Sequence, residues 1–227
     1  MLLPLVLVSA AAASLIQVAD VTLTADRAGQ TTGVVAVFSA RDPSAPGEKP
    51  AAIRRLVITF PAGTRFHFAA SKVVTCRRPN AVLRDQFAPG CPPVSRIGTG
   101  TATANAAPIT SSLKASVHAY AGPGEQIILV LRPTLPAFAS QIIVIRATVR
   151  RSVLTIPVPA VVLGRSKGFA GVSAVLTSLR LTVPARGSGR SALVTAGRCN
   201  AHRFTVRTRL EYAGHVTLEQ VSTTACR

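Results

Sequence analysis

The chain has 227 residues, of which 48% are hydrophobic and 15% charged, and its formal net charge is +18 at pH 7. This apolar content is sufficient for a packed core and excludes an intrinsically disordered chain. Tryptophan is absent and aromatic residues make up only 4% of the chain, so we expect a core of aliphatic side chains. The length permits one large β domain or two domains of about 100 residues each.

The first residues predict a signal peptide. An apolar run at positions 1–8 is followed by the small residues 9–13, which resemble a cleavage site. We therefore expect residues 1–13 to be removed by cleavage after Ala13. No Lys or Arg precedes the apolar run, so either the leader is unusual or the true start codon lies upstream. The apolar run is too short to cross a membrane, and we expect no transmembrane span in the mature chain.

The body of the chain is strand-rich in its pattern. Apolar or alternating runs bounded by Gly, Pro and Ser recur about every ten to fifteen residues. The predicted strands are Val18–Thr24, Gly33–Ala40, Arg55–Phe60, Lys72–Cys76, Ile97–Ala104, Leu113–Tyr120, Gln126–Leu131, Ile142–Val149, Val153–Val158, Ser173–Val183, Leu193–Arg198, Phe204–Tyr212 and Val216–Thr223.

These strands predict an all-β fold, an antiparallel β-sandwich. Two organisations are open: tandem Ig-like sandwiches at 14–125 and 126–227, or one continuous domain. Helix signals are almost absent, and a single helical turn is predicted at Ala81–Phe87, with Asn80 as its cap.

Two hairpins are specific predictions. The strands 142–149 and 153–156 flank the polar turn 150–152, and the strands 207–212 and 216–219 flank the turn 213–215. In the second turn, Gly214 can supply the positive φ that tight turns often require.

A pattern repeated 123 residues apart suggests an internal duplication. The segments 56–62 and 179–185 share Leu, an aliphatic residue, Thr, Pro and Ala at equivalent positions, and a cysteine follows each Pro after 15 residues. Coincidence in a low-complexity alphabet is the alternative, because the two halves of the chain share little else.

The four cysteines, Cys76, Cys91, Cys199 and Cys226, predict disulfides in an exported chain. Three pairings are possible. We favour Cys76–Cys91 and Cys199–Cys226, because each closes a short local loop at low entropic cost. Zinc is the alternative, but no C-x-x-C spacing occurs and His202 lies alone near a cysteine.

The charge comes from 26 basic residues against 8 acidic ones, and only Lys49, Lys72, Lys114 and Lys167 among the basic residues are lysines. An arginine-rich surface attracts polyanions such as anionic cell-wall polymer. The alternative is an arginine-rich codon bias that merely keeps an apolar sheet in solution, since the arginines are scattered. Few aromatic residues accompany them, which disfavours nucleic acid as the partner.

Catalytic patterns are weak. The histidines 67, 118, 202 and 215 are dispersed, the eight acids are too few for paired-carboxylate chemistry, and no G-x-S-x-G or H-E-x-x-H motif occurs. The sequence nominates no catalytic, cofactor-binding or metal-ligating residue, and we expect no cofactor. A hydrolase acting on an acidic substrate remains the alternative to a binding protein.

One stretch carries a resemblance. The strand end Phe60-Pro61-Ala62-Gly63, then Cys76, then the segment 91–100 with its Cys-Pro-Pro-x-Ser-x-Ile-Gly-Thr-Gly pattern resemble a group of uncharacterised secreted proteins of actinomycete-type bacteria. The similar region covers residues 20–120. The resemblance implies export and a β-sandwich, and it implies no established activity.

Together these observations predict a non-catalytic, secreted or extracytoplasmic β-sandwich protein that is associated with the cell wall. We expect it to bind, or to form part of, the cell envelope through a cationic surface. The sequence leaves the ligand and the oligomeric state open.

Overall fold

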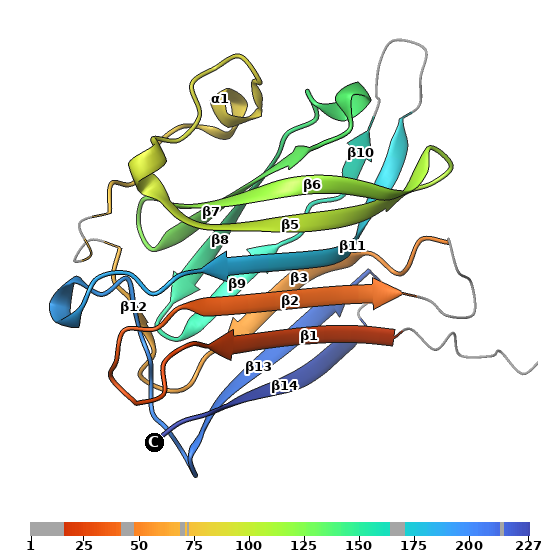
Figure 1. Cartoon of the computed structure of the whole chain (residues 1–227). Coiled ribbons are helices and arrows are strands. Elements are labelled where there is room, and N and C mark those ends of the chain that lie inside the picture. Colours follow the sequence, from red (N-terminus) through yellow and green to blue (C-terminus); the bar gives the residue numbers. More distant parts are fainter. Residues whose placement is uncertain (1–15, 42–47, 69–70, 72, 164–170, 214–215) are drawn as a thin grey trace, which may run out of the picture.

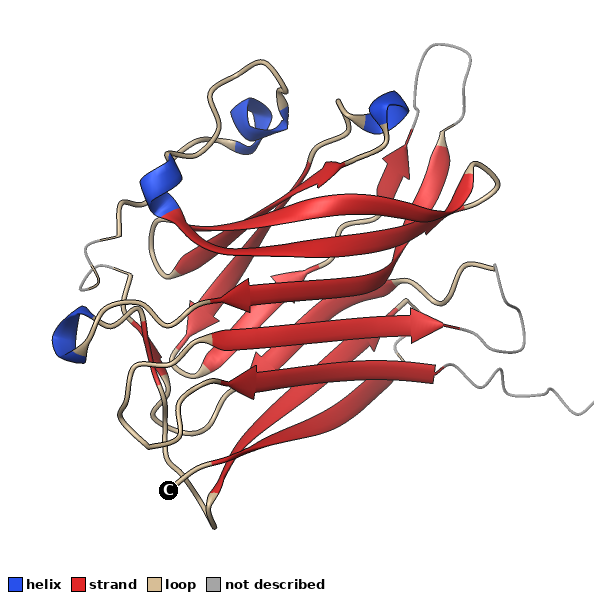
Figure 2. Cartoon of the chain, viewed as in Figure 1, coloured by secondary structure: helices blue, strands red, loops and turns tan. Residues whose placement is uncertain are grey.

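A computed structural model describes residues 16–41, 48–68, 71, 73–163, 171–213 and 216–227. The fold is all-β and antiparallel, as the sequence predicts, with short helical turns confined to the connections (Figure 2). The strands are β1 (Ile16–Leu23), β2 (Val34–Arg41), β3 (Ile53–Thr59), β4 (Arg65–Phe66), β5 (Arg96–Ala106), β6 (Thr110–Ala121), β7 (Gln126–Pro133), β8 (Ile143–Arg150), β9 (Val153–Pro157), β10 (Val161–Leu163), β11 (Val172–Val183), β12 (Val194–Thr195), β13 (Arg203–Tyr212) and β14 (Thr217–Ala225). The helical segments are α1 (Asn80–Arg84) and three 3₁₀ turns, Pro93–Ser95, Pro136–Phe138 and Gly189–Ser191.

In the described residues, twelve strands form one sheet, in the order β1-β2-β11-β5-β6-β7-β8-β9-β3-β13-β14, with β10 paired to β11. The sheet folds over at the β6–β7 hairpin, so that β1, β2, β11, β5 and β6 face β7, β8, β9, β3, β13 and β14 across the core (Figure 1). Strands of the two sequence halves are hydrogen-bonded to each other at β2–β11, β5–β11 and β3–β13. The structure therefore gives no support to separate sandwiches at 14–125 and 126–227.

Side-chain alternation explains how each strand joins this core. In β13, Phe204, Val206 and Leu210 are buried, while Arg203 and Arg207 point outward and are exposed. This is the period-two pattern of a strand with one wet face. By contrast, β7 is apolar on both faces because a loop covers its outer side, and its sequence is correspondingly a continuous apolar run.

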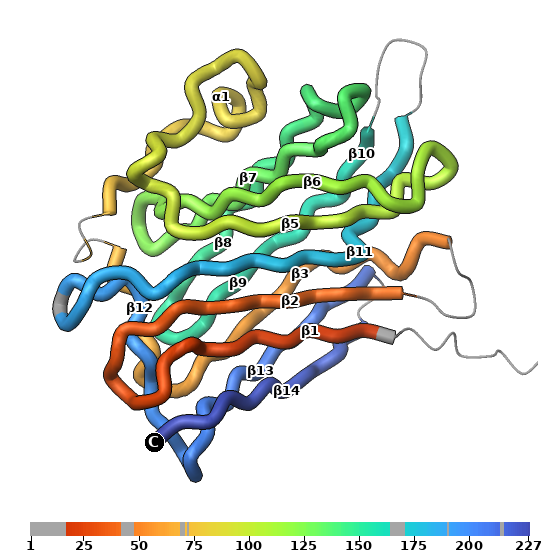
Figure 3. The backbone as a smooth tube through the Cα atoms, in the orientation of Figure 1, coloured from red at the N-terminus to blue at the C-terminus, as the bar shows by residue number. Residues whose placement is uncertain are grey.

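The two edges of the sheet, β1 and β14, meet and lie side by side (Figure 3). They are joined by side chains instead of a backbone ladder. The amide of Ala19 donates to Oε1 of Gln220, and the amide of Val21 donates to Oγ of Ser222 at 3.0 Å. Nε2 of Gln220 in turn donates to the carbonyl of Gln17 at 2.7 Å. We call this contact the seam. It provides hydrogen bonds for backbone groups at the edge of β1, which would otherwise be free to pair with a strand of another chain.

Two further contacts close the seam. The hydroxyl of Tyr212 donates to Oε1 of Gln17, and burial raises the pKa of Tyr212 although this hydrogen bond opposes the shift. At the surface, Arg227 donates twice to Oδ2 of Asp26, at 3.0 and 2.9 Å. This hydrogen bond holds the pKa of the Asp26 carboxyl below its ordinary value.

One end of the sandwich is closed by the short ribbon of β4 and β12, where Val194 pairs with Phe66. The rings of Phe60, Phe66 and Phe68 are in contact here: Phe60 and Phe66 meet edge to face with centroids 5.3 Å apart, and Phe68 is tilted against Phe66 with centroids 6.3 Å apart. β4 and β12 lie in the loops that follow Pro61 and Pro184, so the two segments of the suspected duplication meet at this end. The equivalence of those segments remains a hypothesis.

Most predicted strands are present, with boundaries shifted by a few residues, and three local predictions were wrong. Residues 73–76 form no strand, and the predicted strand 193–198 is reduced to β12. Asn80 does not cap α1, because Pro79 occupies the cap position and the Asn80 side chain binds Arg146 instead. The short strands β4 and β10 were not predicted, since two or three residues carry no readable period.

Both predicted hairpins are present. β8 pairs with β9 and closes at Arg150 opposite Val153, and β13 pairs with β14 out to Glu211 opposite Thr217. The first turn holds Arg151 at φ 56°. The role predicted for Gly214 lies outside the described residues. No helix in the described part of the chain has the length and apolar content needed to cross a membrane.

Candidate functional site

All four cysteines are in disulfides, Cys76–Cys91 and Cys199–Cys226, which is the local pairing favoured by the sequence. Their Cα atoms are 5.2 and 6.0 Å apart. Since disulfides persist in oxidising environments, they indicate an extracytoplasmic location. Bonded sulfurs cannot act as thiolate ligands, so these cysteines do not bind zinc.

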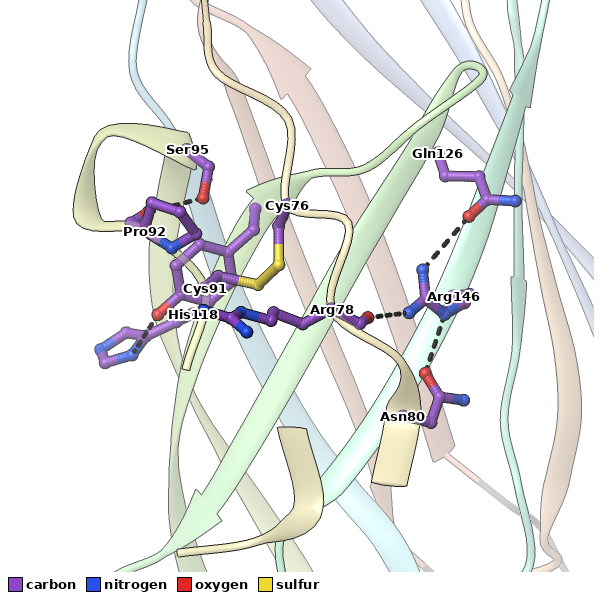
Figure 4. The surroundings of a disulfide bond; sticks show 10 residues. Cys76, Arg78, Asn80, Cys91, Pro92, Ser95, His118, Gln126 and Arg146 are labelled. Atoms are coloured by element: carbon purple, nitrogen blue, oxygen red, sulfur yellow. Dashed lines mark hydrogen bonds between the residues drawn. A yellow bond between two sulfur atoms is a disulfide. The ribbon is translucent and has the colours of Figure 1, made fainter. Parts of the chain in front are cut away.

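The Cys76–Cys91 loop is a cover for the sheet. Its Leu83 packs with Cys76 and Cys91 on Ile128 and Val130, on the outer side of β7. Arg146 fastens the loop: Nε donates to Oδ1 of Asn80 at 2.8 Å and Nη2 to the carbonyl of Arg78 at 2.6 Å (Figure 4). This arginine has a structural role and is not available to a ligand.

Other basic residues are also engaged. Arg55 and Arg209 both pair with Glu211, at 3.3 and 2.6 Å, and Arg227 pairs with Asp26. These pairs are exposed and contribute little to stability. The arginines free of such contacts keep their guanidinium donors unengaged.

Three free arginines converge at one place. A groove of about 310 Å³ lies beside the end of β3, and none of the described residues that line it is acidic. We call it the arginine groove; its lining residues are Thr59, Phe60, Pro61, Ala62, Arg198, Asn200, Arg203, Thr205 and Arg207. In the described part of the chain, the side chains of Arg198, Arg203 and Arg207 make no hydrogen bond or ion pair.

Unequal strand lengths create this groove. β13 pairs with β14 as far as Arg203, but with β3 only as far as Arg207 opposite Thr59. Beyond Thr59 the chain turns away, and the amide of Phe60 donates to the carbonyl of Ser152 at 2.8 Å. The neighbouring part of β13 therefore faces open space on this side.

A tight turn fixes the basic residues at the far side of the groove. Asn200 and Arg203 exchange backbone hydrogen bonds of 3.1 and 3.0 Å, and the intervening Ala201 and His202 have φ of 48° and 59°. Two positive φ angles are typical of a type I′ turn. The Cys199–Cys226 disulfide anchors the residue before this turn, so Arg203 is held on a rigid support.

Gly197 allows Arg198 to reach the groove, because the segment 61–64, which follows β3, lies directly against Gly197. A Cβ at position 197 would meet the carbonyl oxygens of Pro61 and Ala62, the latter at 2.6 Å. The close approach allows the amide of Arg198 to donate to the carbonyl of Ala62 at 2.8 Å. Only a residue without a side chain permits this contact.

We expect Gly197→Ala to lower the free energy of unfolding by about 1–3 kcal/mol, because the added methyl forces backbone apart. Urea unfolding followed by circular dichroism measures this loss. Gly90→Ala is the matched control, since the nearest atom to its Cβ is the end of Arg132 at 3.9 Å. Equal stability of the two variants would contradict the close approach at Gly197.

Chemically, the arginine groove is suited to anions. Guanidinium groups bind carboxylates and phosphates with paired N–H donors. The hydroxyls of Thr59 and Thr205 can add donors or acceptors along the same groove. The groove is open, so it can accept part of a long polymer as readily as a small ion.

The described histidines lie apart from one another and none is hydrogen-bonded to a carboxylate. Nε2 of His67 lies 3.3 Å from Oγ1 of Thr195, and Nδ1 of His118 lies 3.5 Å from the Tyr120 hydroxyl. Burial lowers the pKa of His118, and the nearby charges of Arg96 and Arg132 lower it further. His202 is exposed in the turn beside the arginine groove, and His215 lies outside the described residues.

Among the described residues, no group of three or more His, Cys, Asp or Glu could hold a metal ion. The arginine groove itself was not predicted from the sequence. Part of a signal was available, because Arg207 lies in the predicted strand 204–212 and Arg203 directly precedes it, but nothing in the sequence indicated that β13 includes Arg203 or that β3 stops short beside it. Comparison with protein-family models, curated proteins and solved structures finds no match to this chain.

Proposed function

We propose that this protein is a non-catalytic binding protein of the cell envelope, which holds an anionic cell-wall polymer in the arginine groove. The observation that carries the proposal is the convergence of Arg198, Arg203 and Arg207 in a groove without a lining acid. Such a site attracts successive negative charges of a polymer by direct pairing and by the local field.

Three further observations support it. The net charge of +18 favours association with any polyanion. The two disulfides favour work outside the cytoplasm, as do the predicted signal peptide and the resemblance to secreted actinomycete-type proteins. The groove also lies beside the Cys199–Cys226 disulfide, on a part of the fold that does not need to rearrange when a ligand binds.

The test is a sedimentation assay with purified, protein-free cell wall. We expect the triple variant Arg198→Gln, Arg203→Gln, Arg207→Gln to bind about tenfold more weakly, since three exposed pairs contribute about 0.5 kcal/mol each. Binding of the unaltered protein should fall between about 0.05 M and about 0.5 M salt, because screening shortens the reach of surface charges.

A matched control separates the groove from the total charge. Arg41, Arg84 and Arg180 are exposed and make no side-chain hydrogen bond or ion pair within the described ranges. The triple variant that changes these residues to Gln loses the same charge elsewhere. The proposal for the groove fails if both triple variants bind equally, and the electrostatic mechanism fails if salt has no effect.

A further inference from the structure

A second space lies between the two layers, at the end of the sandwich away from the β4–β12 ribbon. It has a volume of about 230 Å³. We call it the apolar cavity. Its walls come from β3, β5, β6, β7, β8, β10 and β11, and from the chain between β9 and β10. It is distinct from the arginine groove, with which it shares no lining residue.

Small side chains leave this space open. Ala102, Ala104 and Ala115 occupy the cavity wall on β5 and β6, and Ala174 occupies it on β11. Further along β6, Ala119 and Ala121 are 0% exposed and lie in the filled core. Folded interiors normally pack without gaps, so a space of this size beside the alanines of the cavity wall is unusual.

The cavity is open to solvent, and yet it offers water few partners. Ala104, Ala115 and Ala174 line it while remaining partly exposed. Apart from Arg54 and Thr103, every side chain of the lining is apolar. Water needs several polar partners to be held in a cavity, so a space of this kind is better filled by hydrocarbon.

One cation stands at the rim. Arg54 is exposed, and within the described ranges its side chain makes no hydrogen bond or ion pair. The backbone of Arg54 is held in place, because its carbonyl accepts a hydrogen bond of 2.8 Å from the amide of Val158, another lining residue. The neighbouring Glu211 is already paired with Arg55 and Arg209, and among the described residues no acid lines the cavity.

We propose that the apolar cavity binds an aliphatic monocarboxylic acid, with the hydrocarbon chain between the sheets and the carboxylate on Arg54. The size supports a chain of medium length, since an apolar cavity of roughly 150 Å³ is enough to hold one benzene molecule. A charge at one end of an apolar space is the pattern expected for such an amphipathic ligand.

The test is titration calorimetry of the full chain with three probes: octanoate, octan-1-ol with the same chain but no charge, and butyrate with the same charge but a shorter chain. We expect octanoate to bind at least fivefold more tightly than either of the others. Arg54→Gln should weaken octanoate binding about fivefold and leave octan-1-ol unchanged. Arg180→Gln, which removes an exposed arginine from the outer face of β11, should change neither.

A second variant tests the location. Ala104→Leu combined with Ala115→Leu fills the cavity and should abolish binding of octanoate and octan-1-ol. Chemical shifts of labelled alanine methyl groups in the unaltered protein give an independent readout, since binding should move those of Ala104, Ala115 and Ala174. The proposal is overturned if octanoate does not bind or leaves these methyl signals in place. It is also overturned if Arg54→Gln and Arg180→Gln have equal effects.

Discussion

Replacing Phe204 by alanine is expected to lower the free energy of unfolding by about 3–5 kcal/mol, the largest effect of a single substitution considered for this fold. Phe204 is 0% exposed and is among the largest fully buried side chains. It lies on β13 opposite Thr224 of β14 and belongs to the main core cluster, so alanine would leave a space among closely packed side chains.

Urea unfolding followed by far-UV circular dichroism measures this loss, because the chain has no tryptophan to serve as a fluorescence probe. Phe87→Ala is the matched control. Phe87 is 88% exposed, so the same chemical change there should shift the free energy of unfolding by less than about 0.5 kcal/mol. A loss below about 1 kcal/mol for Phe204→Ala would contradict its place in the main core.

Removal of the Cys199–Cys226 disulfide is the second large effect that we expect. For a separation of 27 residues, the chain-entropy argument gives a loss of about 3.5 kcal/mol. Cys226 belongs to the main core and follows β14, which forms one side of the seam. The double variant Cys199→Ala, Cys226→Ala therefore removes both the cross-link and the anchor of the edge strand.

The disulfide Cys76–Cys91 provides the comparison. Its separation of 15 residues predicts a similar entropic contribution of about 3 kcal/mol, but it lies in the smaller cluster under the α1 loop. We expect Cys76→Ala, Cys91→Ala to open this loop locally and to shift the main urea transition less. Hydrogen exchange separates the two cases: increased exchange confined to the amides of 76–91 is expected for the second variant only. Identical exchange in both variants would contradict this division of the core.

Sequence patterns predict the strands of this fold well where a period is long enough to read. The alternation in β13 correctly indicates a strand with one buried face, and the continuous apolar run of β7 correctly indicates a strand that is buried on both faces. The patterns fail where another segment decides the outcome. Asn80 has the chemistry of a helix cap, yet the guanidinium of Arg146, 66 residues away, takes its side chain.

The order of strands was beyond prediction for the same reason. Nothing local indicates that β11 inserts between β2 and β5, since alternation fixes which face is buried and not which neighbour is chosen. The arginine groove depends on the pairing of β3 with β13, because it lies where β13 continues beyond the end of β3. The scattered basic residues therefore predict a ligand of negative charge. The position of the arginine groove depends on the register of β3 and β13, which the sequence does not show.

The seam has a consequence for the order of folding. Its hydrogen bonds join residues 201 to 203 positions apart, which is the slowest kind of contact for a chain to find. The seam can therefore form only after β14, the last strand of the chain, has been synthesised. Until then, the backbone groups at the edges of β1 and β13 are unpaired and can pair with strands of other chains.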